Sequence, residues 1–212
     1  SGSSGVTAVE VRVLSTALSE IKGFGLWPEP FIFEMQRFHQ DLGRFGMDES
    51  MSIILHNLPP IYNSDSEVLI LGSFPSVKSR KAKFYYENPQ NRFWLVVASV
   101  FEQDVPRTTD EKRAFLLRNR IALWDVIASC EIAGSSDQTI RNPVPNDLTP
   151  ILTAAEIKRI FANGRKAEEY FNKLISPNIG RNAVYLPSTS PANAAVNLDQ
   201  LVQAWKAIRQ KF

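Results

Sequence analysis

The sequence predicts an α/β protein in which helices cover both faces of a mainly parallel sheet. From residue 66 onward, short apolar runs alternate with segments whose apolar residues have helical spacing. Apolar runs without polar alternation are typical of parallel strands buried on both faces. Strands that alternate with helices favour a parallel sheet in which each helix crosses over to the next strand.

The elements follow in a regular order along the chain. Four apolar runs have the length of strands, at residues 67–71, 120–124, 157–161 and 183–186. Helical spacing predicts helices at residues 91–101, 110–118, 165–174 and 198–210. A short helix that runs through Ala155 is expected after Asn146 or Thr149, either of which could cap it.

The first 50 residues are expected to be separate from the main domain, which we place at residues 51–212. The opening SGSSG is typical of an expression-tag remnant. Helical spacing at residues 9–21 and 30–42 predicts a helical extension of unknown role, with docking or oligomerisation as one interpretation. Whether it is native, fused or vector-derived stays open.

Composition narrows the class of protein. Of the residues, 44% are hydrophobic and 22% charged, as in ordinary globular proteins, and no apolar run reaches the length of a membrane helix. The single Cys130 excludes an internal disulfide, and no CxxC or HxxxH cluster predicts zinc. We therefore expect a cytoplasmic, intracellular protein without a metal. Residues 51–212 hold 20 basic and 15 acidic residues, which permits a polyanion partner.

Ligands of such sheets bind at the carboxyl ends of the strands. The segments that follow the four expected strands are rich in Gly, Ser, Pro and Asn, as exposed loops with fixed turns would be. We expect them to converge on one cleft, and they are residues 72–76, 124–126, 163–166 and 187–193.

Several of these segments resemble motif blocks of the uracil-DNA glycosylase superfamily. The stretch GSFPS at residues 72–76, followed by YYENPQNRFW at 85–94, resembles the first block of its mismatch-specific and hypoxanthine-specific branches. The hypoxanthine branch in particular is similar at ALWDV (122–126), Cys130-Glu131, GSSD (134–137) and, as its second active-site block, PSTSPAN (187–193). The resemblance covers the chain from about residue 53 to the C-terminus.

This resemblance implies a three-layer α/β/α fold around a four-stranded, mainly parallel sheet. It also implies a DNA repair enzyme that flips a deaminated base out of the helix and hydrolyses its N-glycosidic bond with water, leaving an abasic site. Hypoxanthine is the first candidate base, with uracil and xanthine next. The partner is then DNA, bound by a monomer that is nucleoid-associated if the source is bacterial. No cofactor is expected. No lysine stands out as a Schiff-base nucleophile, so we expect a monofunctional glycosylase.

The catalytic residue implied by the resemblance is Asn91. Related enzymes carry Asp or Asn two residues after the glycine of the first block, where this chain has Phe74, which cannot position water. In the hypoxanthine branch that task is thought to pass to the Asn of the segment that holds Asn91. Its amide oxygen could orient a water molecule. Position alone favours a helix cap, and the two roles are compatible.

Base binding is assigned to residues of the first motif block and of the ALWDV stretch at 122–126. Tyr86 is the expected stacking platform, although the adjacent Tyr85 could serve instead. Ser73 and Phe74 lie in a loop whose backbone N–H groups could meet a base oxygen or a phosphate; a tight turn explains the loop equally well. Asp125 could accept a hydrogen bond from a base N–H, or cap the next segment.

Aromatic residues Phe93 and Trp94 are expected in the core, because they lie at helical positions.

DNA contacts are expected from hydroxyl, backbone and basic groups around the cleft. Six residues and one pair of neighbours carry this expectation: Ser76, Ser188, Ser190, Pro191, Ala192, Asn193, and Arg165 with Lys166 at the start of a helix. An ordinary turn and a solvated helix start are the alternatives. A basic cluster at Lys78, Arg80, Lys81 and Lys83 is either a solvated face or a backbone contact.

Two features leave other functions open. The uracil-specific relatives have a histidine in the second block, whereas no histidine follows His56 here, so neutral groups would have to stabilise the leaving base. Together with Phe74, this favours a non-catalytic DNA-binding module of the same fold as the alternative; Asn91 and Tyr86 argue against it. A nucleotide or phosphate-sugar hydrolase would be expected to show carboxylate or metal-ligand clusters, which the sequence lacks.

Overall fold

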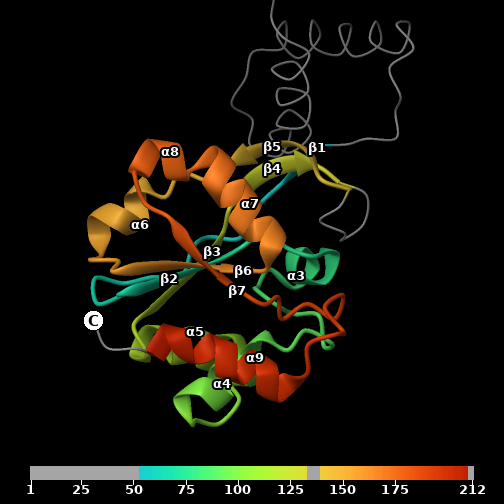
Figure 1. Ribbon diagram of the computed structural model, residues 1–212, viewed down its shortest axis with the longest axis vertical. Helices are drawn as coiled ribbons and strands as arrows, with labels where there is room; N and C mark the ends of the chain where they lie inside the picture. Colours follow the sequence, from blue (N-terminus) through green and yellow to red (C-terminus); the bar gives the residue numbers. More distant parts are fainter. Residues whose placement is uncertain (1–52, 133–138, 210–212) are drawn as a thin grey trace, which may run out of the picture. The chain divides into compact units, whose positions relative to one another are not determined.

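The computed structural model describes residues 53–132 and 139–209, and its larger sheet is the one that the sequence predicts (Figure 1). Four parallel strands lie in the order β3-β2-β6-β7. They are β2 (Val68–Gly72), β3 (Ile121–Asp125), β6 (Arg159–Asn163) and β7 (Ala183–Leu186). The expected α/β class with a four-stranded parallel sheet is therefore confirmed.

Helices lie on both faces of this sheet and complete the three-layer architecture (Figure 1). One layer contains α4 (Phe93–Phe101), α5 (Thr109–Arg118), α9 (Leu198–Trp205) and the 3-10 turn η3 (Lys206–Arg209). The other contains α6 (Thr149–Ala154), α7 (Arg165–Leu174) and α8 (Ser176–Ile179). A further short helix, α3 (Val77–Ala82), follows β2.

A second, three-stranded sheet was not expected from the sequence. It consists of β1 (Ile53–Leu55), β4 (Ile127–Glu131) and β5 (Arg141–Pro145), in the order β1-β4-β5, and β4 and β5 are antiparallel. β4 begins two residues after β3 ends, so a single residue, Val126, connects the two sheets. The backbone N–H of His56 donates to the carbonyl of Ala128 in β4 at 2.7 Å, which holds His56 close to the end of β3.

The main core lies between the larger sheet and the layer of α4, α5 and α9. Phe93, Phe115, Phe161 and Trp205 are all buried there, and Trp94 is buried beside them. Burying large aromatic side chains of this kind is the dominant favourable contribution to folding. The expectation that Phe93 and Trp94 belong to the core is confirmed.

Strand and helix ends differ from the sequence-based bounds by one or two residues. Three strands run one or two residues further than expected, so that Gly72, Asp125 and Asn163 are their last residues. Ladder pairing continues to these ends, because Gly72 lies opposite Asp125. Helix α4 begins at Phe93, and the last expected helix changes to a 3-10 turn after Trp205.

The chain divides into two compact units, and the boundary between them lies between Ile54 and Leu55. The two helices expected at residues 9–21 and 30–42 lie outside the described residues, and so does the GSSD stretch at 134–137. No helix within the described ranges combines the length and the apolar character that a membrane crossing requires.

Candidate active site

The site is built where three neighbouring parallel strands end. Gly72, Asp125 and Asn163 are the last residues of β2, β3 and β6, which lie side by side in the sheet. A Cβ atom on Gly72 would lie 2.1 Å from Oδ1 of Asp125 and 3.1 Å from the hydroxyl oxygen of Tyr86. The missing side chain therefore lets a carboxylate and a phenol converge above one backbone position.

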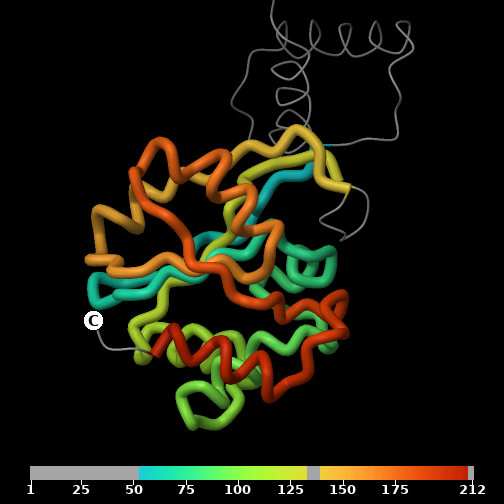
Figure 2. Tube along the Cα trace, in the orientation of Figure 1, coloured from blue at the N-terminus to red at the C-terminus, as the bar shows by residue number. Residues whose placement is uncertain are grey.

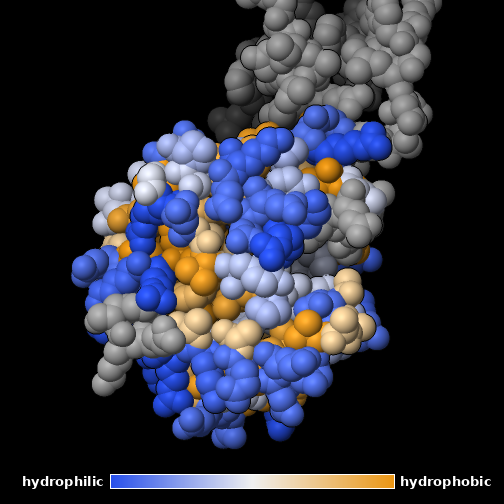
Figure 3. Space-filling view, viewed as in Figure 1, coloured by the Kyte–Doolittle hydropathy of each residue, from blue (hydrophilic) through white to orange (hydrophobic). Residues whose placement is uncertain are grey.

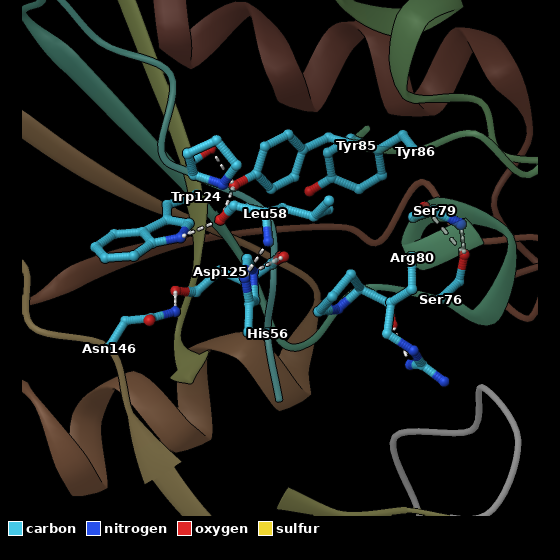
Figure 4. Close-up of polar contacts among 12 residues, drawn as sticks. His56, Leu58, Ser76, Ser79, Arg80, Tyr85, Tyr86, Trp124, Asp125 and Asn146 are labelled. Atoms are coloured by element: carbon cyan, nitrogen blue, oxygen red, sulfur yellow. Dashed lines mark hydrogen bonds and ion pairs between the residues drawn. The ribbon is translucent and has the colours of Figure 1, made fainter. Parts of the chain in front are cut away.

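Asp125 is held by a buried histidine, His56, which no sequence pattern places there. Nε2 of His56 lies 2.8 Å from Oδ2 of Asp125, and the two side chains are 1% and 5% exposed (Figure 4). The backbone N–H of Leu58 donates to Nδ1 of the same ring at 3.2 Å. Because Nδ1 accepts, the ring hydrogen lies on Nε2 and is donated to the carboxylate. Asn146 adds a bond from its amide to the Asp125 carbonyl at 3.0 Å.

Tyr86 and Tyr85 have opposite environments although they are neighbours. Tyr86 has a left-handed backbone with φ 57°, and its ring stacks on Phe93 with centroids 3.9 Å apart. Non-glycine residues in this conformation are uncommon and cluster at functional sites. Tyr85 is buried in the core, and its hydroxyl donates to the carbonyls of Leu58 and Pro59 at 3.2 and 2.9 Å. Burial raises the pKa of Tyr85. Of the two, Tyr86 is the one positioned at the strand ends.

Asn91 satisfies a backbone N–H at the start of α4, although the N-cap residue of this helix is Arg92. Its Oδ1 accepts the backbone N–H of Phe93, the first residue of α4, at 3.0 Å. The same oxygen accepts the hydroxyl of Thr189 at 2.9 Å. The two bonds hold the Asn91 amide in one orientation and use both lone pairs of its oxygen, so an attacking water would share that oxygen with one of these donors. The catalytic role of Asn91 stays a prediction.

Thr189 joins the two motif blocks through Asn163. Its side chain is fully buried, and its hydroxyl accepts from Nδ2 of Asn163 at 3.0 Å. The Thr189 N–H donates to Oδ1 of Asn163 at 3.0 Å, and Nδ2 of Asn163 also donates to the Tyr86 hydroxyl at 3.1 Å. A continuous hydrogen-bonded chain thus runs from Asn91 through Thr189 and Asn163 to Tyr86. Satisfied buried networks of this kind fix side-chain positions.

Loop 187–197 connects β7 to α9 (Figure 2). It is fastened to the first block by Arg92. The guanidinium donates to the carbonyls of Val196 at 2.5 Å and Asn193 at 2.8 Å, with a longer contact to Ser190 at 3.5 Å. The Arg92 N–H also donates to the carbonyl of Thr189 at 3.0 Å, so four bonds from this residue hold the loop at one end of the sheet.

The polar groups of this loop close its own turns. Oγ of Ser188 accepts from the N–H of Ser190, Oγ of Ser190 accepts from the N–H of Ala192, and the amide of Asn193 donates to the Ser188 carbonyl. Pro191 and Ala192 are exposed, and apolar surface gathers over this loop in Figure 3. The turn interpretation is thus satisfied, and phosphate binding by these residues stays a prediction.

The start of α7 lies against the same loop. Gly164 has φ +101°, and a Cβ there would lie 2.9 Å from Cβ of Ser188, so glycine permits the close approach. Arg165 pairs with Glu168 and stacks over the Tyr185 ring at 4.1 Å, and Lys166 pairs with Glu169 at 2.7 Å. These partners lie on the helix surface or beside it, where ion pairs are weak and exchange readily for other anions.

The remaining residues of the first block are partly or fully buried. Ser73 and Phe74 are both 8% exposed, and the ring of Phe74 meets the ring of His56 edge to face with centroids 6.0 Å apart. The guanidinium carbon of Arg80 lies over the Phe74 ring, 5.5 Å from the ring centroid. Oγ of Ser76 accepts the N–H of Ser79 at 3.2 Å, so Ser76 caps α3. Phe74 thus packs beside the His56–Asp125 pair.

A metal site would need several ligands close together. Within residues 53–132 and 139–209, no three His, Cys, Asp or Glu side chains gather in this way. The expected absence of a metal stays a prediction.

Comparison with known proteins decides the family. The family model of the uracil DNA glycosylase superfamily matches residues 59–209, which is most of the chain. The chain belongs to the uracil DNA glycosylase superfamily. The resemblance found in the motif blocks is therefore confirmed.

Similar members of the superfamily come from methanogenic archaea. A protein named hypoxanthine DNA glycosylase from Methanosarcina acetivorans is 33% identical over 158 residues, covering 74% of this chain and 98% of that protein. One of the same name from Methanosarcina barkeri is 33% identical over 137 residues, covering 64% and 85%. A solution NMR structure from M. acetivorans, named as a candidate uracil DNA glycosylase, has a TM-score of 0.61 at 30% identity and covers 72% of this chain and 97% of that one.

Sequence reasoning missed three residues of this candidate site: His56, Asn163 and Thr189. His56 and Asp125 are 69 positions apart, so no local pattern links them. Asn163 was seen only as part of a loop, although a polar residue at the end of a strand was a usable signal. Thr189 stands between two serines in the second block, and nothing in the sequence marks it as the buried member.

Proposed function

We propose that this protein is a DNA repair glycosylase that hydrolyses the N-glycosidic bond of hypoxanthine in DNA and leaves an abasic site. Membership of the uracil DNA glycosylase superfamily supports the reaction, and the names of the two archaeal relatives support the base. The observation that carries the proposal is the convergence of the Asp125 carboxylate and Tyr86 above Gly72, bonded through Asn163 and Thr189 to Asn91.

Base recognition requires that the nucleotide leave the helix and enter a pocket. Tyr86 offers an aromatic face for stacking and is itself supported by Phe93. Asp125 offers a carboxylate oxygen as acceptor for a ring N–H. Backbone N–H groups of the loop at Ser73 and Phe74 are the proposed donors to a base oxygen.

Bond cleavage develops positive charge on the sugar and negative charge on the base. Asn91 is the proposed group that orients the attacking water from beneath the sugar. An amide is too weak a base to remove a proton outright, so its contribution is to position the water and to stabilise the sugar cation through its dipole. The leaving base would be stabilised by neutral donors of the first block, since the His56 ring hydrogen is directed to Asp125.

DNA backbone contacts are proposed on both sides of this site. Pro191 and Ala192 of loop 187–197 are exposed, and with Asn193 they would enter the space that the flipped base leaves, while Ser188 and Ser190 would contact the phosphates. Ser76, Arg165 and Lys166 would meet phosphates, with the basic residues of α3 beside them. The protein would act in the cell as a monomer, without a cofactor, in its main domain at residues 51–212, and residues 6–50 would be an accessory extension.

A second candidate is a non-catalytic DNA-binding module of the same fold. One observation favours it: the amide oxygen of Asn91 already accepts two hydrogen bonds, from Phe93 and Thr189. Under this alternative the network around Thr189 serves structure alone, and DNA binds without release of a base.

Single-turnover cleavage separates the two candidates. Labelled duplexes with one hypoxanthine, uracil, xanthine or normal adenine are incubated with excess protein, and alkali then breaks any abasic site. The proposal predicts cleavage at hypoxanthine and none at adenine. Binding of the duplexes without any cleavage, in double or single strands, would instead support the DNA-binding module.

A further inference from the structure

His56 is a buried side chain at the site to which the reaction above gives no task of its own. Oδ2 of Asp125 is held by Nε2 of His56 at 2.8 Å, and Oδ1 lies above the backbone of Gly72, beside the Tyr86 hydroxyl. One oxygen is thus turned toward the core and the other toward the strand end where a base would enter (Figure 4).

The histidine has little freedom to turn. Its ring packs between three aromatic rings, with centroid distances of 6.0 Å to Phe74, 6.2 Å to Tyr85 and 6.3 Å to Trp124. Its Nδ1 is occupied by the Leu58 N–H at 3.2 Å. A ring fixed at Nδ1 and on its faces can donate in one direction only, and Asp125 lies in that direction.

We propose that His56 is a positioning residue for base discrimination: it fixes the Asp125 carboxylate so that Oδ1 accepts the ring N–H of a deaminated base and rejects adenine and cytosine. This inference rests on the proposed glycosylase function. It assigns the choice of substrate class to one buried pair.

The chemistry of the bases explains the choice. Deamination replaces an exocyclic amine by a carbonyl, and the adjacent ring nitrogen changes from a hydrogen-bond acceptor to an N–H donor. Hypoxanthine, uracil and xanthine therefore offer a proton to a carboxylate. Adenine and cytosine offer a lone pair, and two facing acceptors repel. The Asp125 carboxylate is already largely shielded from water, which makes that mismatch costly. Adenine would exclude the remaining water and offer the carboxylate no donor in return.

The test uses a substrate that lacks the N–H donor at the ring position next to the carbonyl. Single-turnover rates are measured for a duplex with hypoxanthine and for one with 1-deazahypoxanthine, in which a C–H replaces the ring N–H. Wild type is compared with Asp125→Asn, His56→Phe and His56→Gln. Trp124→Phe is the matched control, because it removes part of the packing around His56 and the Trp124 bond to the Leu58 carbonyl but keeps both partners of the His56–Asp125 bond.

Wild type is expected to cleave hypoxanthine faster than its deaza analogue. The ratio of the two rates should be about 10- to 100-fold larger in wild type than in Asp125→Asn, as for one hydrogen bond to a charged group. In Asp125→Asn the His56 donor would hold the amide oxygen on its own side and turn the NH2 group toward the base. This variant should therefore lose the preference and gain relative activity on adenine. His56→Phe should lose most of the preference, since the carboxylate is no longer oriented, and His56→Gln should restore part of it. Trp124→Phe should keep the wild-type ratio.

Equal rate ratios in wild type and Asp125→Asn would overturn the inference, as would a wild-type ratio in folded His56→Phe. If His56→Phe fails to fold, the Asp125→Asn result still decides, because it keeps the volume of the side chain. If Trp124→Phe lost the preference to the same extent as His56→Phe, packing around His56 would explain the effect without its hydrogen bond to Asp125, and this would also overturn the inference. Absence of any hypoxanthine cleavage by wild type would overturn the glycosylase function itself, which is a different result from cleavage without discrimination.

Discussion

Thr189→Val tests whether the network between the motif blocks supports both stability and reaction. Valine has nearly the shape of threonine, so the change removes the hydroxyl and little else. The hydroxyl makes two bonds, to Asn91 at 2.9 Å and from Asn163 at 3.0 Å. Each is worth about 0.5–1.5 kcal/mol net, and both partners keep another bond, so the expected loss is about 1–3 kcal/mol.

This loss is large enough to measure by thermal unfolding. For a chain of this size it corresponds to a fall in Tm of about 2–12 °C. Release of Asn91 from Thr189 should also slow single-turnover cleavage of hypoxanthine by about 10-fold or more, because the amide is no longer held in one orientation. Thr189→Ser is the control: it keeps the hydroxyl and should keep the rate, while losing one buried methyl. A valine variant with a wild-type Tm and a wild-type rate would refute the reasoning.

Three further changes probe other parts of the account. Gly72→Ala places a Cβ 2.1 Å from the buried Asp125 carboxylate, so we expect about 100-fold slower cleavage together with a fall in Tm, and normal kinetics would contradict the convergence at Gly72. Burial raises the pKa of Tyr85, so the unfolded chain loses its proton near pH 10 while the native state keeps it; stability should fall above about pH 10, and Tyr85→Phe should flatten that fall in urea titrations. Arg165→Ala should weaken binding to any duplex and reduce the slope of log affinity against log salt by about 1, and an unchanged slope would remove Arg165 from the DNA surface.

The larger sheet could be predicted because its strands carry their own signal. β2 and β3 are apolar over nearly their whole length and are buried on both faces, which is the pattern that parallel strands require. Their final residues, Gly72 and Asp125, look like loop in the sequence. Ladder bonds extend to them all the same, because the two strands pair in register to the end.

The smaller sheet could not be predicted for the opposite reason. β5 contains two prolines and is mostly exposed, and a strand of that composition is normally found only at an edge. β4 pairs with β5 through irregular register, so no regular alternation marks it. Helix α3, with the sequence VKSRKA, is short and polar, and its basic residues were interpreted only as a charge cluster.

The loops that carry the site could be predicted from the sequence, but the hydrogen bonds between its residues could not. Tyr86, Asn91 and Asp125 stand in segments that motif and topology both indicate. The bond between His56 and Asp125 depends on β1 and β4 lying together, and that contact belongs to the sheet that was missed. Long-range pairing of this kind leaves no local pattern in a single sequence.

Asn91→Ala gives the most direct test of the central claim, that this fold cleaves the bond of a flipped hypoxanthine with Asn91 at the sugar. Release of free hypoxanthine and duplex binding are measured side by side for wild type and variant, with Asn88→Ala, a nearby exposed-loop change, as the control. The account predicts a loss in single-turnover rate of at least about 100-fold in Asn91→Ala, with affinity for the duplex changed by less than about threefold. Undiminished release of hypoxanthine by Asn91→Ala, in a protein that is folded and binds normally, would contradict it.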